Sequence, residues 1–124
     1  MKRVLAIALA VMLVALSLAG CAPAADTGAE IALITDKGNI DDKSFNQGAW
    51  EGVVAFAEAE GITHTYIKPE EASDAGYLAA IDLAVTGGAK VIVTPGFLFE
   101  VSVYEAQTKY PDIKFILLDR KSVV

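Results

Sequence analysis

Residues 31–50 read Ile31-Ala-Leu-Ile-Thr-Asp-Lys-Gly-Asn-Ile-Asp-Asp-Lys-Ser-Phe-Asn-Gln-Gly-Ala-Trp50, and this stretch decides the fold. Its first four residues are apolar and rich in β-branched side chains, which predicts a strand buried on both faces. An acidic loop follows, and after Ser44 the apolar residues return at helical spacing. Ser44 and Gln47 have the spacing of a capping box, in which serine accepts from an amide three residues on and glutamine reaches back. The stretch therefore predicts a strand, a polar loop and an amphipathic helix.

The same alternation continues along the chain. Further strands are predicted at 63–68, 90–94 and 114–118, with Gly61 as the C-cap of the helix that ends near Glu60. After a connection at 69–74, a second helix is predicted through Tyr77 to Val85, up to the Gly87-Gly88 stop, and a third at 99–110. Strands that alternate with helices four times favour a parallel sheet with right-handed crossovers. We therefore expect an α/β fold with helices on both faces of the sheet.

The N-terminal residues have the pattern of an export signal. Lys2 and Arg3 precede the apolar run 4–18, which is shorter than the ~20 residues that a membrane-spanning helix needs. A buried N-terminal helix is the alternative for residues 1–20. Cys21 is the sole cysteine, so it has no partner for an intramolecular disulfide. Residues 21–29 are small and polar and predict a flexible tether, which leaves 30–124 as the globular part.

The charge of that remaining part is strongly negative. Without residues 1–20, which contain Lys2, Arg3 and no acid, the 10 basic residues become 8 against 16 acidic ones, a formal charge of −8. Nucleic acids and anionic lipid surfaces are bound by basic patches, so neither is expected as a partner.

Polar and aromatic side chains collect where the predicted strands end. The candidate site residues are Asp36, Asp42, Phe45 and Asn46 after the first strand, Gly96 and Phe97 after the third, and Asp119 after the fourth. The carboxyl ends of parallel strands share one edge of a sheet, where ligands bind. Carboxylates and amides bind hydroxyl and N–H groups, aromatic rings offer flat faces, and several carboxylates together repel anions. The mixture suits an uncharged polyol that carries an aromatic base, such as a nucleoside.

Each of these residues also has a simpler interpretation. Asp41 and Asp42 are favourable near the positive N-terminus of a helix, whatever else they do. Phe45 could pack beside the helix start, and Trp50 lies on the apolar helix face as a core residue would. His64 has no second histidine or cysteine nearby in the sequence, so we expect no metal site.

The run Thr35-Asp-Lys-Gly-Asn-Ile-Asp-Asp-Lys-Ser-Phe-Asn-Gln-Gly-Ala-Trp-Glu-Gly52 strongly resembles the signature of the basic membrane protein family of bacterial lipoproteins. Val93-Thr-Pro-Gly-Phe97 and Phe115-Ile-Leu-Leu-Asp119 add to the resemblance, in the right order and spacing. Leu18-Ala-Gly-Cys21 resembles a lipobox. The family includes a purine nucleoside receptor of spirochaetes and nucleoside-binding proteins of ABC importers.

The resemblance implies a type I periplasmic-binding-protein fold with two α/β lobes, of which this chain holds part of the N-terminal one. It implies cleavage before Cys21, acylation of that cysteine, and anchoring to the outer face of the cell membrane. The ligand would pass to an ABC permease, without catalysis and without a cofactor. By the same resemblance, Asp36 would bind ribose hydroxyls or a base N–H, and Phe45 would stack on the base. Asn46 would bond the ligand or brace the loop. Gly96 and Phe97 would line the wall of the pocket, and Asp119 would complete the polar side of that pocket.

The family's members are about three hundred residues long, so we expect that this chain is a fragment that lacks the second lobe. Such a fragment is expected to bind weakly or not at all, and its unpaired sheet edge would lower its stability.

Other functions are weighed on the same residues. A sugar receptor of the same fold is the alternative ligand class, because aromatic rings also stack on sugars. A receiver domain needs an aspartate after the third strand, where Pro95-Gly96-Phe97 stands, and no G-x-G-x-x-G for dinucleotides is present. Hydrolysis by paired carboxylates lacks a supporting histidine or nucleophile pattern. A surface antigen with no transport role is the third class.

Overall fold

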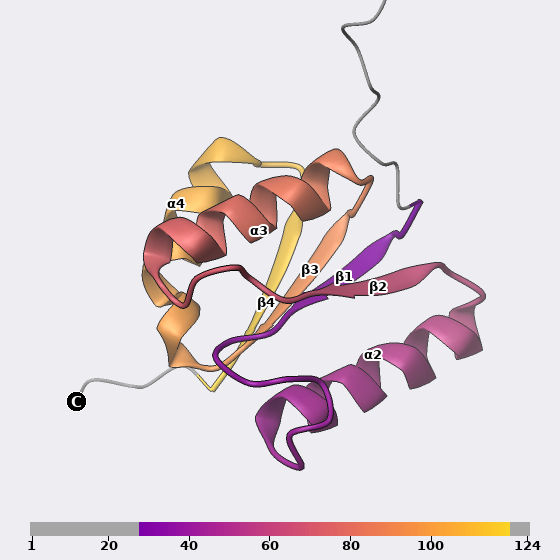
Figure 1. The fold of residues 1–124 in the computed structure, drawn as a ribbon. Coiled ribbons are helices and arrows are strands. Elements are labelled where there is room, and N and C mark those ends of the chain that lie inside the picture. Colours follow the sequence, from indigo (N-terminus) through magenta and orange to yellow (C-terminus); the bar gives the residue numbers. More distant parts are fainter. Residues whose placement is uncertain (1–27, 120–124) are drawn as a thin grey trace, which may run out of the picture.

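The computed structural model describes residues 28–119, which form a four-stranded parallel sheet flanked by helices (Figure 1). The strands are β1 (Ile31–Ile34), β2 (His64–Ile67), β3 (Val91–Pro95) and β4 (Lys114–Leu118). The helices are α2 (Phe45–Glu60), α3 (Asp74–Thr86), α4 (Glu100–Lys109) and the short 3-10 helix η1 (Phe97–Phe99). The predicted α/β fold with a parallel sheet is confirmed.

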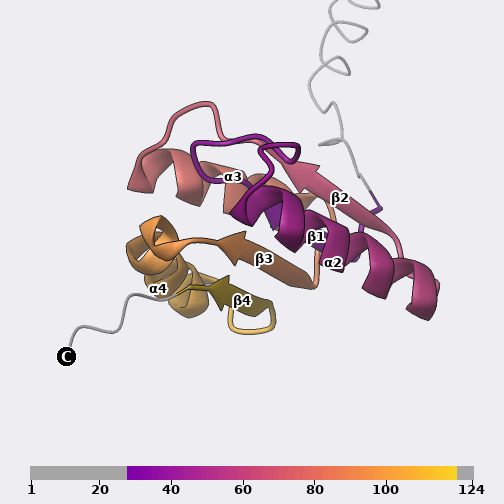
Figure 2. The same cartoon turned by 90° about the horizontal axis from the view of Figure 1, so that it is seen from below.

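The strand order is β2-β1-β3-β4, so β1 lies inside the sheet with a parallel partner on each side. Leu33, for example, is in register with Tyr66 on β2 and with Val93 on β3. All four residues of β1 are buried, as the apolar run at 31–34 predicted. Figure 2 shows β4 at the outer edge of the sheet.

The helices form a layer on each face of the sheet. Successive β1 side chains point to opposite faces, so Ile31 and Leu33 pack towards α2, while Ala32 and Ile34 pack towards α3 and α4. The α3–α4 side holds the larger core, with Ile81 and Phe99 fully buried. Figures 1 and 2 show α2 on one side of the sheet and α3 and α4 on the other, as predicted.

Two helix ends agree with the sequence pattern. Gly61 ends α2 in the left-handed conformation, with φ 68°, and its N–H bonds the carbonyl of Ala57. Ser73 begins α3, where its Oγ accepts a hydrogen bond from the amide of Gly76 at 3.1 Å.

The start of α2 differs from the predicted capping box. Ser44 makes no side-chain capping bond, and Gln47 reaches back to the amide of Lys43 rather than to Ser44. Lys43 adopts a positive φ of 55°, and the amides of Ser44 and Gln47 both donate to Asp42 Oδ1. The capping-box prediction is therefore wrong, because the turn at Lys43 brings a carboxylate into the position that the serine was expected to fill.

The predicted export signal, Cys21 and most of the tether lie outside the described residues. Within residues 28–119, no helix is both long and apolar enough to cross a membrane.

Candidate ligand-binding site

The carboxyl ends of β1, β3 and β4 meet at one edge of the sheet. The amide of Gly96, directly after β3, donates to the carbonyl of Leu118 at the end of β4, at 2.9 Å. A Cβ at Gly96 would stand 3.7 Å from Asp36 Oδ2, which follows β1. Asp36 and Gly96, which are sixty positions apart in the sequence, thus lie side by side here.

Asn46 holds the loop after β1 in place. It is 2% exposed, and its Oδ1 accepts from the amide of Asp36 at 3.2 Å. Its Nδ2 donates to Asp36 Oδ1 and to Asp42 Oδ2, at 2.8 Å each. Of the two roles foreseen for Asn46, the structure shows the bracing of the loop.

Asp36 presents a carboxylate whose two oxygens differ. Oδ1 accepts from Asn46 and also from the amide of Gly38, at 2.9 Å. Oδ2 accepts no hydrogen bond from residues 28–119 and faces Gly96. The orientation of the carboxylate is therefore fixed by one oxygen, while the other remains available to a hydroxyl or N–H donor.

Asp42 acts at the start of α2. Its Oδ1 caps the helix and its Oδ2 accepts from Asn46, so both oxygens are engaged. Desolvation raises the pKa of Asp42, but the hydrogen bonds from Asn46, Ser44 and Gln47 outweigh it and leave the pKa below its usual value. This capping is the simpler of the two roles considered for Asp42, and its contact with a ligand stays a prediction.

Two aromatic rings at this edge are open to solvent. Phe45, the first residue of α2, is 52% exposed, and Phe97, the first residue of η1, is 49% exposed. Phe45 lines a shallow hollow of about 490 Å³ together with Ala49 and Leu118. Burial of either ring would stabilise the fold, yet both are exposed. Their faces are therefore accessible to a flat partner that stacks on them.

Asp119 and Gly96 follow their strands in backbone conformations with positive φ. Gly96 has φ 109°, a region that only glycine adopts easily, and Asp119 has φ 58° and is exposed. The predicted site residues therefore lie along one edge. Their contacts with a ligand stay predictions.

Tyr77 is a residue near this edge that the sequence placed on a helix but not in the candidate site. It lies in the first turn of α3 and is 2% exposed, and its ring stacks on Phe99 with centroids 4.3 Å apart. Burial raises the pKa of Tyr77, and the charges of Asp36 and Asp74 raise it further. Helical periodicity identified the buried ring but carried no signal for the surroundings of its hydroxyl.

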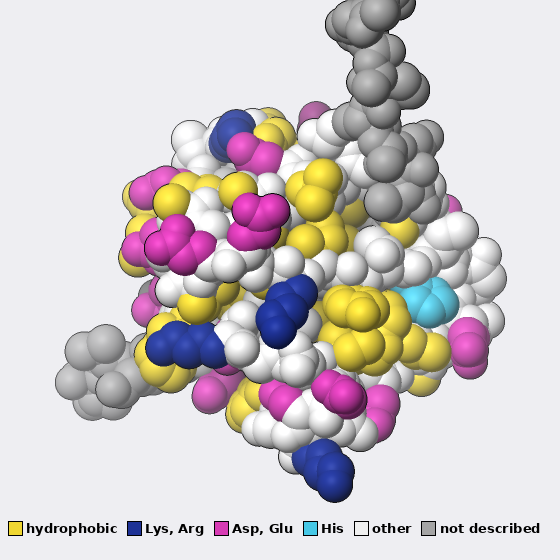
Figure 3. Space-filling model, viewed as in Figure 1, with side chains coloured by type: hydrophobic (Ala, Val, Ile, Leu, Met, Phe, Trp, Pro, Cys, Tyr) yellow, Lys and Arg dark blue, Asp and Glu magenta, His cyan; other side chains and the backbone are white. Residues whose placement is uncertain are grey.

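Trp50 and His64 pack together on the α2 side, away from the edge. The Trp50 ring lies 5.5 Å from that of His64 and 5.3 Å from that of Tyr66, centroid to centroid. Figure 3 shows the histidine beside apolar surface. No group of metal-ligating residues occurs within residues 28–119.

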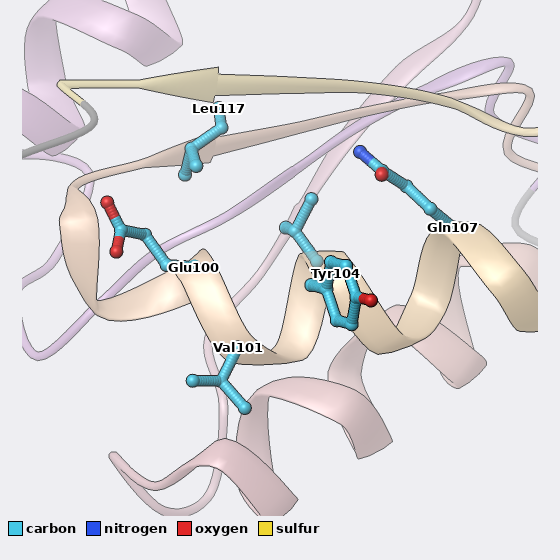
Figure 4. Close-up of a pocket in the computed structure, with 6 residues that line it drawn as sticks. Glu100, Val101, Tyr104, Gln107 and Leu117 are labelled. Atoms are coloured by element: carbon cyan, nitrogen blue, oxygen red, sulfur yellow. The ribbon is translucent and has the colours of Figure 1, made fainter. Parts of the chain in front are cut away.

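A separate hollow of about 390 Å³ lies between α4 and β4. Figure 4 shows Glu100, Val101, Tyr104 and Gln107 along α4, with Leu117 opposite on β4. None of the predicted site residues lines it.

The family of the chain follows from comparison with known proteins. Residues 29–122 match the family model described as ABC transporter substrate-binding protein PnrA-like. The chain belongs to this family of substrate-binding proteins, which confirms the resemblance seen in the sequence.

Curated relatives agree with this assignment. The chain is 33% identical over 92 residues to a CD4+ T-cell-stimulating antigen of Listeria monocytogenes, covering 72% of this chain and 26% of that protein. It is 29% identical over 130 residues to the ABC transporter nucleoside-binding protein BmpA of Lactococcus lactis, covering 95% of this chain and 36% of that protein. The chain thus spans about a quarter to a third of the length of these relatives.

A solved structure supports the fold. An ABC transporter solute-binding protein from Aeropyrum pernix superposes with a TM-score of 0.64 at 27% identity, over 76% of this chain and 26% of that one. The described residues therefore have the architecture of part of a lobe of an α/β periplasmic-binding fold.

Proposed function

We propose that this chain is part of a lipid-anchored, extracytoplasmic solute-binding protein that captures a purine nucleoside for import by an ABC permease. It acts by binding and release and is not an enzyme. The observation that carries the proposal is the carboxylate of Asp36, which is fixed through Oδ1 and open at Oδ2, in a chain of the PnrA-like family.

The side chains at the edge have chemistry that matches a nucleoside. Asp36 Oδ2 is an acceptor for ribose hydroxyls or a base N–H, and Asp119 supplies a second carboxylate. The rings of Phe45 and Phe97 are suited to stacking on a purine. Gly96 has no side chain, so the ligand can approach the backbone closely. Phosphorylated ligands are disfavoured by the carboxylates and the net negative charge.

The relation to the membrane and the permease rests on the sequence. Cleavage before Cys21 followed by acylation gives the two or more acyl chains that stable anchoring requires. The permease is the partner that an ABC substrate-binding protein serves. The matches cover only 26% and 36% of these relatives, so a second lobe is the proposed source of the opposite wall of the cleft.

The test is a titration of the purified chain with inosine, guanosine and ribose, followed by NMR so that millimolar binding is still seen. Asp36→Asn and Phe45→Ala should each weaken inosine binding by roughly tenfold or more, the loss expected for a charged hydrogen bond or a stacked ring. Matched controls are Asp41→Asn in the same loop and Phe56→Ala, since Phe56 is also on α2 and 53% exposed.

The outcomes separate the candidate functions. A response to ribose alone would replace the nucleoside by a sugar, and unaltered inosine binding in Asp36→Asn would remove this site from the binding. Inosine recovered as free base would show cleavage and contradict the absence of catalysis.

A further inference from the structure

The hydroxyl of Tyr77 is buried and has no hydrogen-bond partner within residues 28–119. A buried hydroxyl without a partner destabilises a folded protein, and most buried polar atoms are paired. Phenylalanine at this position would keep the stacking on Phe99 and avoid the unpaired oxygen. The hydroxyl therefore has no evident structural use in the ligand-free chain.

Contacts through Phe99 and Gly96 connect the side chain of Tyr77 with Asp36. Ile34, two residues before Asp36 in the sequence, packs in the same core as Tyr77. Gly96 stands next to Asp36 Oδ2, and its carbonyl accepts from the amide of Phe99, on which Tyr77 stacks. Asp36 is also the first of the two carboxylates whose charge acts on the Tyr77 hydroxyl, the other being Asp74.

We propose that Tyr77 is a positioning residue of the ligand site, whose hydroxyl donates to the Asp36 carboxylate when a ligand is bound. This rests on the proposed function, because Asp36 is taken to contact the ligand. A carboxylate oxygen has two lone-pair sites, so Oδ2 can accept from the ligand and from Tyr77 together. The bond would hold Oδ2 as well, beside the bonds that Asn46 and Gly38 make to Oδ1, and would strengthen as the ligand excludes water.

The test compares Tyr77→Phe with the unaltered chain in three measurements. The inosine dissociation constant should rise by roughly two- to tenfold, as expected for one lost hydrogen bond. The urea midpoint should stay the same or rise, because ring packing is kept and the unpaired oxygen is gone. The Tyr77 resonance of a chain with 13C-labelled tyrosine rings, assigned by its loss in Tyr77→Phe, should shift when inosine is added.

A matched control separates the two carboxylates. In Asp74→Asn the inosine-dependent shift of the Tyr77 resonance should persist, and in Asp36→Asn it should disappear. A shift that depends on Asp74 and not on Asp36 would overturn the proposal. So would an unchanged inosine affinity in Tyr77→Phe, since a purely structural tyrosine predicts that result. Failure of both the unaltered chain and a full-length relative of the family to bind any nucleoside would instead overturn the proposed function.

Discussion

At the scale of single residues, the site is organised by Asn46. Its side chain bonds the backbone and the carboxylate of Asp36 and the carboxylate of Asp42, so one amide joins a strand end, a loop and a helix start. Local spacing in the sequence predicted that Asp36 and Asn46 would be neighbours. It could not predict that Asn46 is buried or how its donors and acceptor are shared, since both depend on the path of the intervening loop.

Gly96 gives a residue-scale prediction. With φ 109°, Gly96→Ala should destabilise the chain by about 1–3 kcal/mol, because an alanine side chain strains this backbone conformation. Gly52→Ala is the control, since a Cβ at Gly52 meets nothing within 4 Å and the residue lies inside α2. That change should stabilise by roughly 0.5–1 kcal/mol through helix propensity. Urea unfolding measures both, and a neutral Gly96→Ala would contradict the strain argument.

At the scale of elements, periodicity located the four strands, α2 and α4 to within one residue. It did not predict η1, and α3 begins at Asp74, inside the region predicted as a connection. The buried run at 31–34 and the glycine after α2 act locally, which is why the sequence predicted them. The start of α2 was mispredicted because the positive φ of Lys43 is not encoded in a spacing rule. The short helix η1 (Phe97–Phe99), just ahead of the helix predicted at 99–110, was missed for a similar reason, since Gly96 turns the chain at a positive φ before α4 begins.

The two serines before α2 and α3 give the element-scale prediction. Ser73→Ala should destabilise by about 1 kcal/mol, because it removes the acceptor for the amide of Gly76. Ser44→Ala should change stability by less than about 0.5 kcal/mol, because Ser44 makes no side-chain capping bond. Thermal unfolding of the two variants checks the contrast. Equal losses would mean that Ser44 caps α2 after all.

At the scale of the whole molecule, α3 and α4 are joined by a charged contact on the outside of their layer. Asp82 accepts from Lys109 Nζ at 2.7 and 2.9 Å and from the Tyr110 hydroxyl at 2.8 Å. Burial raises the pKa of Asp82, but the bonds from Lys109 and Tyr110 outweigh it and hold that pKa below 3.8. The hydrogen bond that Lys109 donates to Asp82 also raises the pKa of Lys109 above its usual value of 10.5.

These directions predict how stability depends on pH. The contribution of Asp82 is fully present above 3.8 and is lost as the pH falls through its lower folded pKa. That of Lys109 is fully present below 10.5 and is lost as the pH rises through its higher folded pKa. Lys109→Met should therefore lower the urea midpoint at neutral pH, and the difference should vanish in strong acid and shrink in high salt, because the pair is half-exposed.

Lys90→Met is the control, because Lys90 pairs with one oxygen of Glu30 and its side chain is 72% exposed. It should shift the midpoint less than Lys109→Met does. A Lys109→Met difference that stayed constant down to pH values below the folded pKa of Asp82 would contradict the argument.

Topology predicts which residues meet at this edge of the sheet, but it does not predict how the buried side chains behind them pack. Parallel strands bring 36, 96 and 119 to one side of the sheet, and that rule needs only the strand pattern. The unpaired hydroxyl of Tyr77 depends on how α3 packs over the sheet, which no local pattern contains.

The central place of β1 in the sheet has a consequence for amide hydrogen exchange. The backbone N–H groups of β1 face a partner strand on either side, so we expect their protons to exchange only when the sheet itself opens. Asp36 is two residues beyond the end of this slowest-exchanging segment. A ligand bound at Asp36 would therefore be attached to the part of the chain that opens last. Its dissociation would not require the sheet to open, and would not cause the sheet to open.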